Sequence, residues 1–288
     1  MKIDFDSLLR EGKSVLLADG GSTKMEWLLA KKGRIVWRHT EPGLNPLVSG
    51  FDAMADTFDH VAGQLPESPK AVGYYGAGCI ESVCGALSEL LTLSFGCPAE
   101  CGSDLLLAAR MLCPTGEGLI CILGTGSNSG LFRDGAMVNH TPSLGYALGD
   151  EGGAAYMGRC IVAGCLRRQA DEAAMRQWKS LGISEQDTLA QVYGPERKPG
   201  AWLGDILRRM EPAYADSPWL QSMIEQSMRD FFSNIIMCYG LENDVPVYFA
   251  GTPAARFAEI LHRLGREYGV SVADIVARPF DKLNPQDK

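Results

Sequence analysis

Residues 15–24, Val-Leu-Leu-Ala-Asp-Gly-Gly-Ser-Thr-Lys, form an apolar run that ends in a turn of small residues, and residues 119–128, Leu-Ile-Cys-Ile-Leu-Gly-Thr-Gly-Ser-Asn, repeat that plan. Short apolar runs bounded by glycine predict buried strands. Each run is followed across its turn by a second strand-like run, and then by further pairs of a strand and a helix. Because this layout occurs twice, the sequence predicts an α/β protein with two related lobes.

The composition is that of a globular protein with a sizeable core. The chain has 288 residues, a formal net charge of −8 and 46% hydrophobic residues. It has no basic block and no long apolar run, so neither nucleic acid nor a membrane is expected as a partner. Nine cysteines occur without a Cys-x-x-Cys pair, and the N-terminus lacks the cationic start and apolar stretch of a signal peptide. We therefore expect reduced thiols and a cytoplasmic location.

The two small-residue turns are the segments that could carry chemistry. Turns of Gly, Ser and Thr let backbone amides approach an anion and add hydroxyl donors. One such turn is most often a plain hairpin, but two of them, one in each half, could hold a polyphosphate from both sides. Asp19 in the first turn suits a hydrated Mg²⁺, which prefers oxygen ligands. Residues 7–14 lack the first glycine of a P-loop, and the glycines of residues 124–130 miss the dinucleotide spacing.

Four motifs together resemble a known superfamily. They are Asp-Gly-Gly-Ser-Thr-Lys at residues 19–24, Gly-Thr-Gly-Ser-Asn at 124–128, Gly-Asp-Glu-Gly at 149–152 and Phe-Ala-Gly-Thr at 249–252. In this order they resemble the phosphate-1, phosphate-2 and adenosine motifs of the sugar kinase/actin/heat-shock chaperone superfamily. More narrowly, the chain resembles the BadF/BadG/BcrA/BcrD-type ATPase family, which includes N-acetylglucosamine kinases and N-acetylmuramic acid kinases.

The resemblance implies a fold and a function. The implied fold is the two-lobed ribonuclease-H-like fold of actin-like ATPases, with a cleft between the lobes. Residues 1–107 would form the first lobe, with residues 278–288 packed on it, and residues 108–277 would form the second. The implied protein is an ATP- and Mg²⁺-dependent kinase for a hydroxyl group of N-acetylglucosamine, N-acetylmuramic acid or both, serving amino-sugar metabolism and cell-wall recycling. Its expected partner is a small-molecule amino sugar, and a homodimer is one assembly that the resemblance allows.

The resemblance also assigns roles to residues at matching positions. Asp104 matches the base that takes the proton from the accepting hydroxyl, and Asp19 matches the acid that positions Mg²⁺ through water. ATP and its metal are expected at Asp19, Gly20, Gly21, Ser22, Thr23, Lys24, Gly124, Thr125, Gly126, Gly251 and Thr252. The amino sugar is expected at Asn45, Ser127, Asn128, Ser143, Leu144, Gly145, Tyr146 and Asp150.

Several features leave alternatives open. Residues 143–148, Ser-Leu-Gly-Tyr-Ala-Leu, replace a Gly-Trp-Gly-His type segment of several N-acetylglucosamine kinases, so the resemblance does not decide which amino sugar is accepted. Asp104 follows the candidate N-cap Ser103 and could be an ordinary helix-start acid, and Asn45 before a proline could be a turn residue. The four histidines show no paired spacing, which favours surface or structural roles.

The same resemblance allows two other functions. An ATP-driven activator of acyl-CoA reductases or dehydratases would need a Cys-Gly-Gly type motif for its iron–sulfur cluster, and the chain lacks one. A non-catalytic sugar or nucleotide sensor would not need a proton acceptor, so the presence of both Asp19 and Asp104 favours an enzyme.

Overall fold

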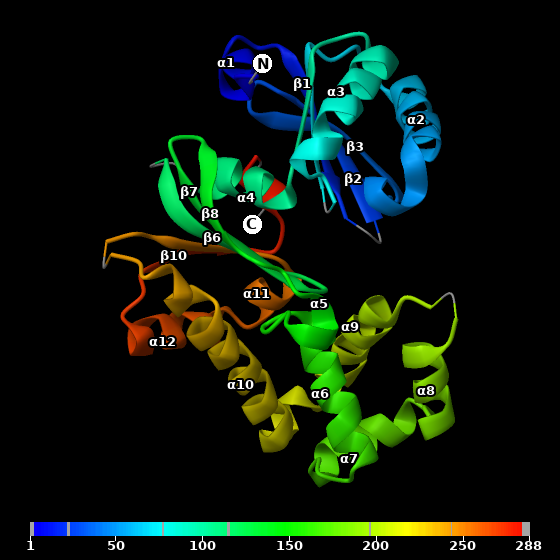
Figure 1. Cartoon of the computed structure of the whole chain (residues 1–288), viewed down its shortest axis with the longest axis vertical. Helices are drawn as coiled ribbons and strands as arrows, with labels where there is room; N and C mark the ends of the chain where they lie inside the picture. Colours follow the sequence, from blue (N-terminus) through cyan, green and yellow to red (C-terminus); the bar gives the residue numbers. More distant parts are fainter. Residues whose placement is uncertain are drawn as a thin grey trace. The chain divides into compact units, whose positions relative to one another are not determined.

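The computed structural model describes residues 3–21, 24–76, 78–113, 116–195, 197–242 and 244–283 (Figure 1). The chain divides into two compact units. Unit 1 contains the chain up to Met111 and from Phe280 onward, and unit 2 is Leu112–Pro279. Each unit is built around one five-stranded sheet.

The sheet of unit 1 has the strand order β3-β2-β1-β4-β5. Strands β1, β2 and β3 form an antiparallel meander, and β4 and β5 continue the sheet parallel to β1. The strands are β1 (Ser14–Gly20), β2 (Lys24–Lys31), β3 (Arg34–Pro42), β4 (Ala71–Gly76) and β5 (Ala99–Gly102). The helices are α1 (Phe5–Arg10), α2 (Pro46–Gln64), α3 (Glu81–Phe95) and α4 (Asp104–Leu112), with a 3-10 turn η3 (Pro279–Lys282).

Alternate residues of β1 face two separate cores, because successive side chains of a strand point to opposite faces of the sheet. Leu16 and Ala18 belong to a cluster that α2 and α3 complete, and Trp27 is buried in it against aromatic rings of both helices. Val15 and Leu17 belong to the opposite cluster, which α1, α4 and η3 complete. Both faces of this sheet are therefore covered, which explains the continuous apolar character of β1.

The sheet of unit 2 repeats this arrangement in the order β10-β9-β6-β7-β8. Its first three strands again form an antiparallel meander, and β9 and β10 run parallel to β6. The strands are β6 (Glu117–Leu123), β7 (Ser127–Arg133), β8 (Ala136–Thr141), β9 (Val247–Ala250) and β10 (Val272–Val276). The duplicated layout predicted from the sequence is thus confirmed at the level of topology.

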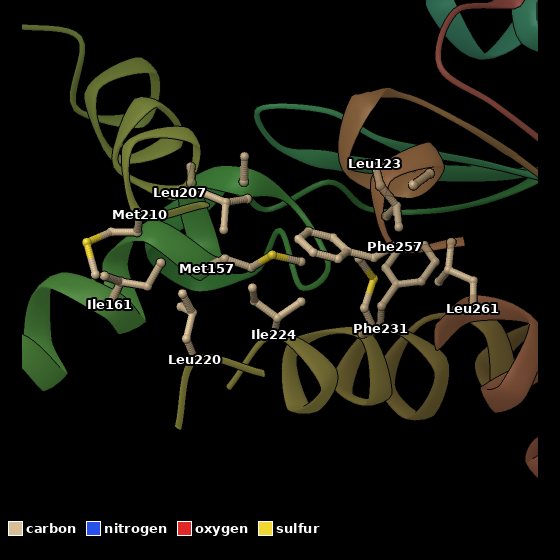
Figure 2. Packing of buried hydrophobic residues seen from close by; sticks show 14 of the residues in the cluster. Leu123, Met157, Ile161, Leu207, Met210, Leu220, Ile224, Phe231, Phe257 and Leu261 are labelled. Atoms are coloured by element: carbon tan, nitrogen blue, oxygen red, sulfur yellow. The ribbon is translucent and has the colours of Figure 1, made fainter. Parts of the chain in front are cut away.

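Unit 2 carries a larger helical part. Its helices are α5 (Gly145–Leu148), α6 (Ala154–Leu166), α7 (Glu172–Ser180), α8 (Glu185–Tyr193), α9 (Pro199–Met210), η1 (Glu211–Asp216), α10 (Pro218–Asn234), η2 (Ile236–Tyr239), α11 (Thr252–Arg256) and α12 (Ala258–Tyr268). Side chains of α6, α9 and α10 point toward one another in one core, among them Met157, Leu207 and Ile224 (Figure 2). Gly158 allows α6 to approach α9 closely, because a Cβ there would lie 1.9 Å from the Leu203 carbonyl oxygen.

Several elements differ from the sequence prediction. The helix expected to run past Arg168 ends at Leu166, because Arg168 adopts a left-handed φ of 58° and the chain turns back there. The helix expected over residues 254–268 is interrupted at Phe257, which separates α11 from α12. Strand β10 and helix α2 were not predicted. Over the residues that the structure describes, no helix has the length and apolar character needed to span a membrane.

Candidate active site

In unit 1 the phosphate-1 motif joins β1 to β2. Its residues Ser22 and Thr23 lie outside the described part of the chain. Gly20, at the end of β1, packs against Gly76 at the end of the parallel strand β4, where an added Cβ would lie 2.5 Å from the Gly20 carbonyl oxygen. Similarly, a Cβ on Gly21 would lie 2.9 Å from the Lys24 carbonyl oxygen. The glycines here let backbone segments approach one another closely.

In unit 1 the charge of one carboxylate, Asp104, acts on another, Asp19. Asp19 lies on the α4 side of the sheet, and Asp104 is the first residue of α4. The predicted N-cap is present, since the Ser103 hydroxyl accepts a hydrogen bond from the Leu106 amide at 3.2 Å. The Asp104 carboxylate accepts one from the Leu105 amide at 2.9 Å, which fixes its orientation.

Burial raises the pKa of both acids, and like charges add to the rise at Asp19. The pKa of Asp19 rises from an ordinary 3.8 to about 6, first because of burial and then because of the charges of Asp104 and Glu26, while Lys24 opposes the rise. Burial also raises the pKa of Asp104, opposed by backbone hydrogen bonds. A half-buried group of carboxylates that repel one another fits a divalent cation with oxygen ligands, because the cation would offset their charge.

Asn45 has a structural role in unit 1. It is the N-cap of α2, and its side-chain oxygen accepts a hydrogen bond from the Leu47 amide at 2.9 Å. A Cβ on Gly78 would lie 2.3 Å from the same oxygen, so the Asn45 side chain is packed closely from a second direction. Contact with a sugar hydroxyl stays a prediction for this residue.

In unit 2 the phosphate-2 and adenosine motifs lie side by side. They follow β6 and β9, which are neighbouring parallel strands, so both turns leave the same edge of the sheet. Gly251 adopts a φ of 121°, and a Cβ there would lie 1.9 Å from the Leu123 carbonyl oxygen. This close approach requires glycine. Thr252 then begins α11.

The phosphate-2 turn is tied to the start of α6. The Gly124 amide donates to the Gly126 carbonyl oxygen at 2.9 Å, which closes the turn. The amides of Ala154 and Ala155 donate to the carbonyl oxygens of Gly124 and Thr125 at 2.9 and 2.8 Å. These two amides of α6 are therefore used to hold the turn, and the exposed Thr125 is at its tip.

The Gly-Asp-Glu-Gly motif places an acid against this turn. Asp150 adopts a left-handed φ of 62°, which is uncommon outside glycine. A Cβ on Gly126 would lie 2.6 Å from a carboxylate oxygen of Asp150, so only glycine leaves room for the acid. Burial raises the pKa of Asp150, while hydrogen bonds from the Ser127 amide and the Ser143 hydroxyl lower it.

A cavity of about 250 Å³ opens beside Asp150 within unit 2. Five residues predicted to bind the sugar line it, namely Ser127, Asn128, Ser143, Leu144 and Asp150. The predicted Gly145 and Tyr146 lie outside this lining; Tyr146 packs against the core of unit 2. The structure thus brings most of the predicted sugar-binding residues of this unit together at one cavity.

Comparison of the sequence with protein-family models and with curated proteins finds no match. The structure, in contrast, closely resembles a "putative N-acetylglucosamine kinase" from Porphyromonas gingivalis, with a TM-score of 0.86 and 31% identity over 93% of this chain and 96% of that one. The chain belongs to this family of sugar kinases.

Two more distant structures share the fold of the family. A "putative N-acetylglucosamine kinase" from Chromobacterium violaceum superposes with a TM-score of 0.66 at 17% identity, over 94% of this chain and 97% of that one. A ROK family glucokinase from Streptomyces griseus, solved with glucose and AMPPNP, superposes with a TM-score of 0.61 at 14% identity, over 94% and 96%. The predicted actin-like ATPase fold is therefore confirmed, whereas the narrower BadF/BadG-type assignment stays a prediction.

The sequence prediction missed part of the cavity in this sugar kinase. Its lining also includes Ser129, Thr141, Pro142, Gly149, Glu151, Phe231, Asn234 and Ile235. The Asn234 amide donates to Glu151 at 3.3 Å. The hydroxyl of Tyr239 bonds the Ser129 hydroxyl at 2.9 Å and accepts from the Thr141 amide at 2.8 Å, so it holds β7 and β8 at the cavity. Gly149 and Glu151 belong to the Gly-Asp-Glu-Gly motif, whereas no local motif marks Phe231, Asn234 and Ile235, because these three reach the cavity from α10 and its C-terminal end, about a hundred residues after Ser127 and Asn128.

Proposed function

We propose that the protein is an ATP-dependent kinase that phosphorylates a hydroxyl group of an N-acetylated amino sugar, either N-acetylglucosamine or N-acetylmuramic acid. The observation that carries the proposal is the carboxylate pair of unit 1, in which Asp104 is fixed at the start of α4 and raises the pKa of Asp19. The sugar class is supported by the name of the Porphyromonas gingivalis relative.

Asp104 is proposed as the general base. It would accept the proton of the sugar hydroxyl as the hydroxyl oxygen attacks the γ-phosphorus of ATP, and ADP would leave with the electrons of the broken bond. The raised pKa of Asp104 suits this role, because a more basic carboxylate is a better proton acceptor at neutral pH. The hydrogen bond from the Leu105 amide holds the carboxylate in one orientation, and phosphoryl transfer depends chiefly on such positioning.

The cofactors are proposed to be ATP and Mg²⁺. Asp19 would hold the hydrated metal, which neutralises charge on the transferred phosphoryl group when it is bound. The turns at Thr125 and Gly251 would hold the nucleotide, since both are small-residue turns at one edge of the sheet. The glucokinase of the same fold that was solved with AMPPNP supports ATP as the nucleotide.

The cavity beside Asp150 is proposed to receive polar groups of the sugar. Ser127, Asn128 and Ser143 offer hydroxyl and amide groups, and the Asp150 carboxylate can accept hydrogen bonds from sugar hydroxyls. Because the Ser143–Leu144 segment of the lining departs from the sequence of several N-acetylglucosamine kinases, both sugars remain in the proposal.

An assay of ADP release over a sugar panel tests the proposal. The panel contains glucose, glucosamine, N-acetylglucosamine, N-acetylmannosamine and N-acetylmuramic acid, and turnover should be highest with an N-acetylated sugar. Asp104→Asn should lower turnover by about 10²- to 10⁴-fold, the contribution of a positioned base, with sugar affinity nearly unchanged. Glu81→Gln, an exposed acid in the first turn of α3, is the matched control and should retain activity.

Two outcomes would contradict the proposal. Absence of turnover with every sugar, while calorimetry detects sugar binding, would favour a non-catalytic sensor. Turnover of Asp104→Asn within a few-fold of the unsubstituted protein would show that the base lies elsewhere, and Asp150 would then be the next carboxylate to substitute.

A further inference from the structure

Two histidines and a glutamate meet on one face of unit 1. His39 and Glu41 are two residues apart on β3, so their side chains point to the same side of the strand. His60 comes from the C-terminal half of α2. The Nε2 atom of His39 lies 2.6 Å from Oε1 of Glu41, and the Nε2 atom of His60 lies 3.4 Å from the same oxygen. One possible ligand atom from each residue lies within 4.8 Å of the other two.

The surrounding structure holds two of these side chains in place. The ring of Trp37 stacks on the ring of His39, with 5.4 Å between centroids and 10° between planes, and Trp37 itself packs against the core that α2 and α3 share. The Glu41 side chain is 16% exposed, whereas that of His60 is 57% exposed. The cluster therefore has a fixed strand side and an accessible helix side.

We propose that His39, Glu41 and His60 form a binding site for a zinc ion. Two imidazole nitrogens and one carboxylate oxygen are a common zinc ligand set, with water at the fourth position. Imidazole ligands favour zinc and related transition metals over Mg²⁺, which prefers oxygen. This site is independent of the proposed kinase reaction.

The distances agree with this assignment. Ligand atoms about 2.0–2.2 Å from a tetrahedral zinc are roughly 3.4 Å apart. The separation between His60 and Glu41 is already 3.4 Å. The separation between His39 and Glu41 is 2.6 Å, a direct hydrogen bond that must open on metal binding. The opening required between these two atoms is less than about 1 Å, and the exposed His60 side chain can follow it.

The strand register separates this cluster from the carboxylates of the candidate active site. Cross-strand pairing places Trp27 opposite His39 and Met25 opposite Glu41, and both partners belong to the core beneath α2 and α3. Asp19 is paired with Glu26, which lies between Met25 and Trp27 on β2, so these two acids point to the other face of the sheet. A zinc ion would link β3, the last strand at this edge of the sheet among those described, to α2.

Zinc titration of the full-length, tag-free protein tests the proposal by two measurements. In imidazole ¹⁵N NMR spectra, one equivalent of zinc should shift the ring signals of His39 and His60, and leave those of the exposed His140 and His262 unchanged. In calorimetry, His39→Gln and His60→Gln should each weaken zinc binding by at least about 10- to 100-fold. His140→Gln and His262→Gln are the matched controls and should bind zinc as the unsubstituted protein does.

Cobalt distinguishes this site from the thiols of the nine cysteines. Co²⁺ bound at His39, Glu41 and His60 should show no thiolate-to-metal charge-transfer absorption. The proposal is overturned if zinc does not bind, if binding survives His39→Gln and His60→Gln, or if the bound cobalt shows a thiolate signature.

Discussion

Replacing Asp19 by asparagine should stabilise the metal-free protein at neutral pH while it removes the proposed activity. The Asp19 carboxyl is half-buried, and its pKa rises from 3.8 to about 6 through burial and the charges of Asp104 and Glu26. Between these two pH values the folded protein binds more protons at Asp19 than the unfolded chain does. The free energy of unfolding therefore falls as the pH rises through this window. Above about pH 6 the ionised Asp19 lowers it by the full amount.

The size of this cost follows from the shift. One pKa unit corresponds to about 1.4 kcal/mol, so a rise from 3.8 to about 6 corresponds to about 3 kcal/mol. The asparagine amide is also buried and costs about 1–2 kcal/mol where it lacks a partner. We therefore expect Asp19→Asn to increase the free energy of unfolding of unit 1 by about 1–3 kcal/mol at pH 7. Below about pH 4 this gain should disappear, because the acid is then protonated in both states.

Native-state hydrogen exchange of the β1 and β4 amides measures this free energy for unit 1 alone. Exchange should be followed between pH 4 and pH 8 in a chelating buffer, with Asp59→Asn, an exposed acid of α2, as the control that stays near the unsubstituted protein. A carbon-13 titration of Asp19 in the Asp104→Asn variant should show a lowered pKa, since one like charge is removed. The reasoning is refuted if Asp19→Asn destabilises unit 1 at pH 7, or if its effect is the same at pH 4.

Three further substitutions, one of them with a matched control, test other features. In thermal unfolding, Gly251→Ala should lower the free energy of unfolding by more than about 3 kcal/mol, because its Cβ would lie 1.9 Å from a carbonyl oxygen. Gly124→Ala is the control: its Cβ would meet nothing within 4 Å, so the free energy of unfolding should change by less than about 0.5 kcal/mol. Arg110→Met should cost about 3–5 kcal/mol in hydrogen exchange of unit 1, because it leaves the largely buried Glu100 carboxylate without its ion pair. In the same measurement, Tyr74→Phe should leave the free energy of unfolding unchanged or raise it by up to about 1 kcal/mol, since the buried hydroxyl has no hydrogen-bond partner among the described residues. A loss above about 1 kcal/mol would contradict this prediction.

The sequence was most informative where a local pattern determines a local structure. The apolar runs that end at Gly20 and Gly124 predicted strands with tight turns, and β1 and β6 end there. Ser103 followed by Asp104 predicted a helix start, and α4 begins at Asp104 with the Ser103 hydroxyl as its cap. Each of these features depends on residues within a few positions of one another. The repeated order of such features was sufficient to predict the duplicated topology.

The sequence was least informative where distant segments meet. Phe231, Asn234 and Ile235 reach the cavity of unit 2 from α10 and its C-terminal end, although the other lining residues belong to segments about a hundred positions earlier. The Tyr239 hydroxyl, from η2, bonds the lining residue Thr141. His39 and His60 have no metal-ligand spacing in the sequence, and only the packing of α2 near β3 brings His60 to His39 and Glu41. Strand β10 was missed because only one of its five residues is fully buried, so its apolar signal is weak.

The polar groups that are most costly to the fold of unit 1 gather where β1 meets its turn. Asp19 is ionised at neutral pH although burial and two like charges oppose its ionisation. The hydroxyl of Tyr74 is buried without a partner among the described residues, and a Cβ on Gly20 would lie 2.4 Å from it. The Trp27 indole nitrogen is also buried without a hydrogen-bond partner among the described residues, whereas Arg110 and Glu100 form an ion pair. Stability alone does not account for the buried charge of Asp19, whereas the proposed cation site would, because a bound cation would offset that charge.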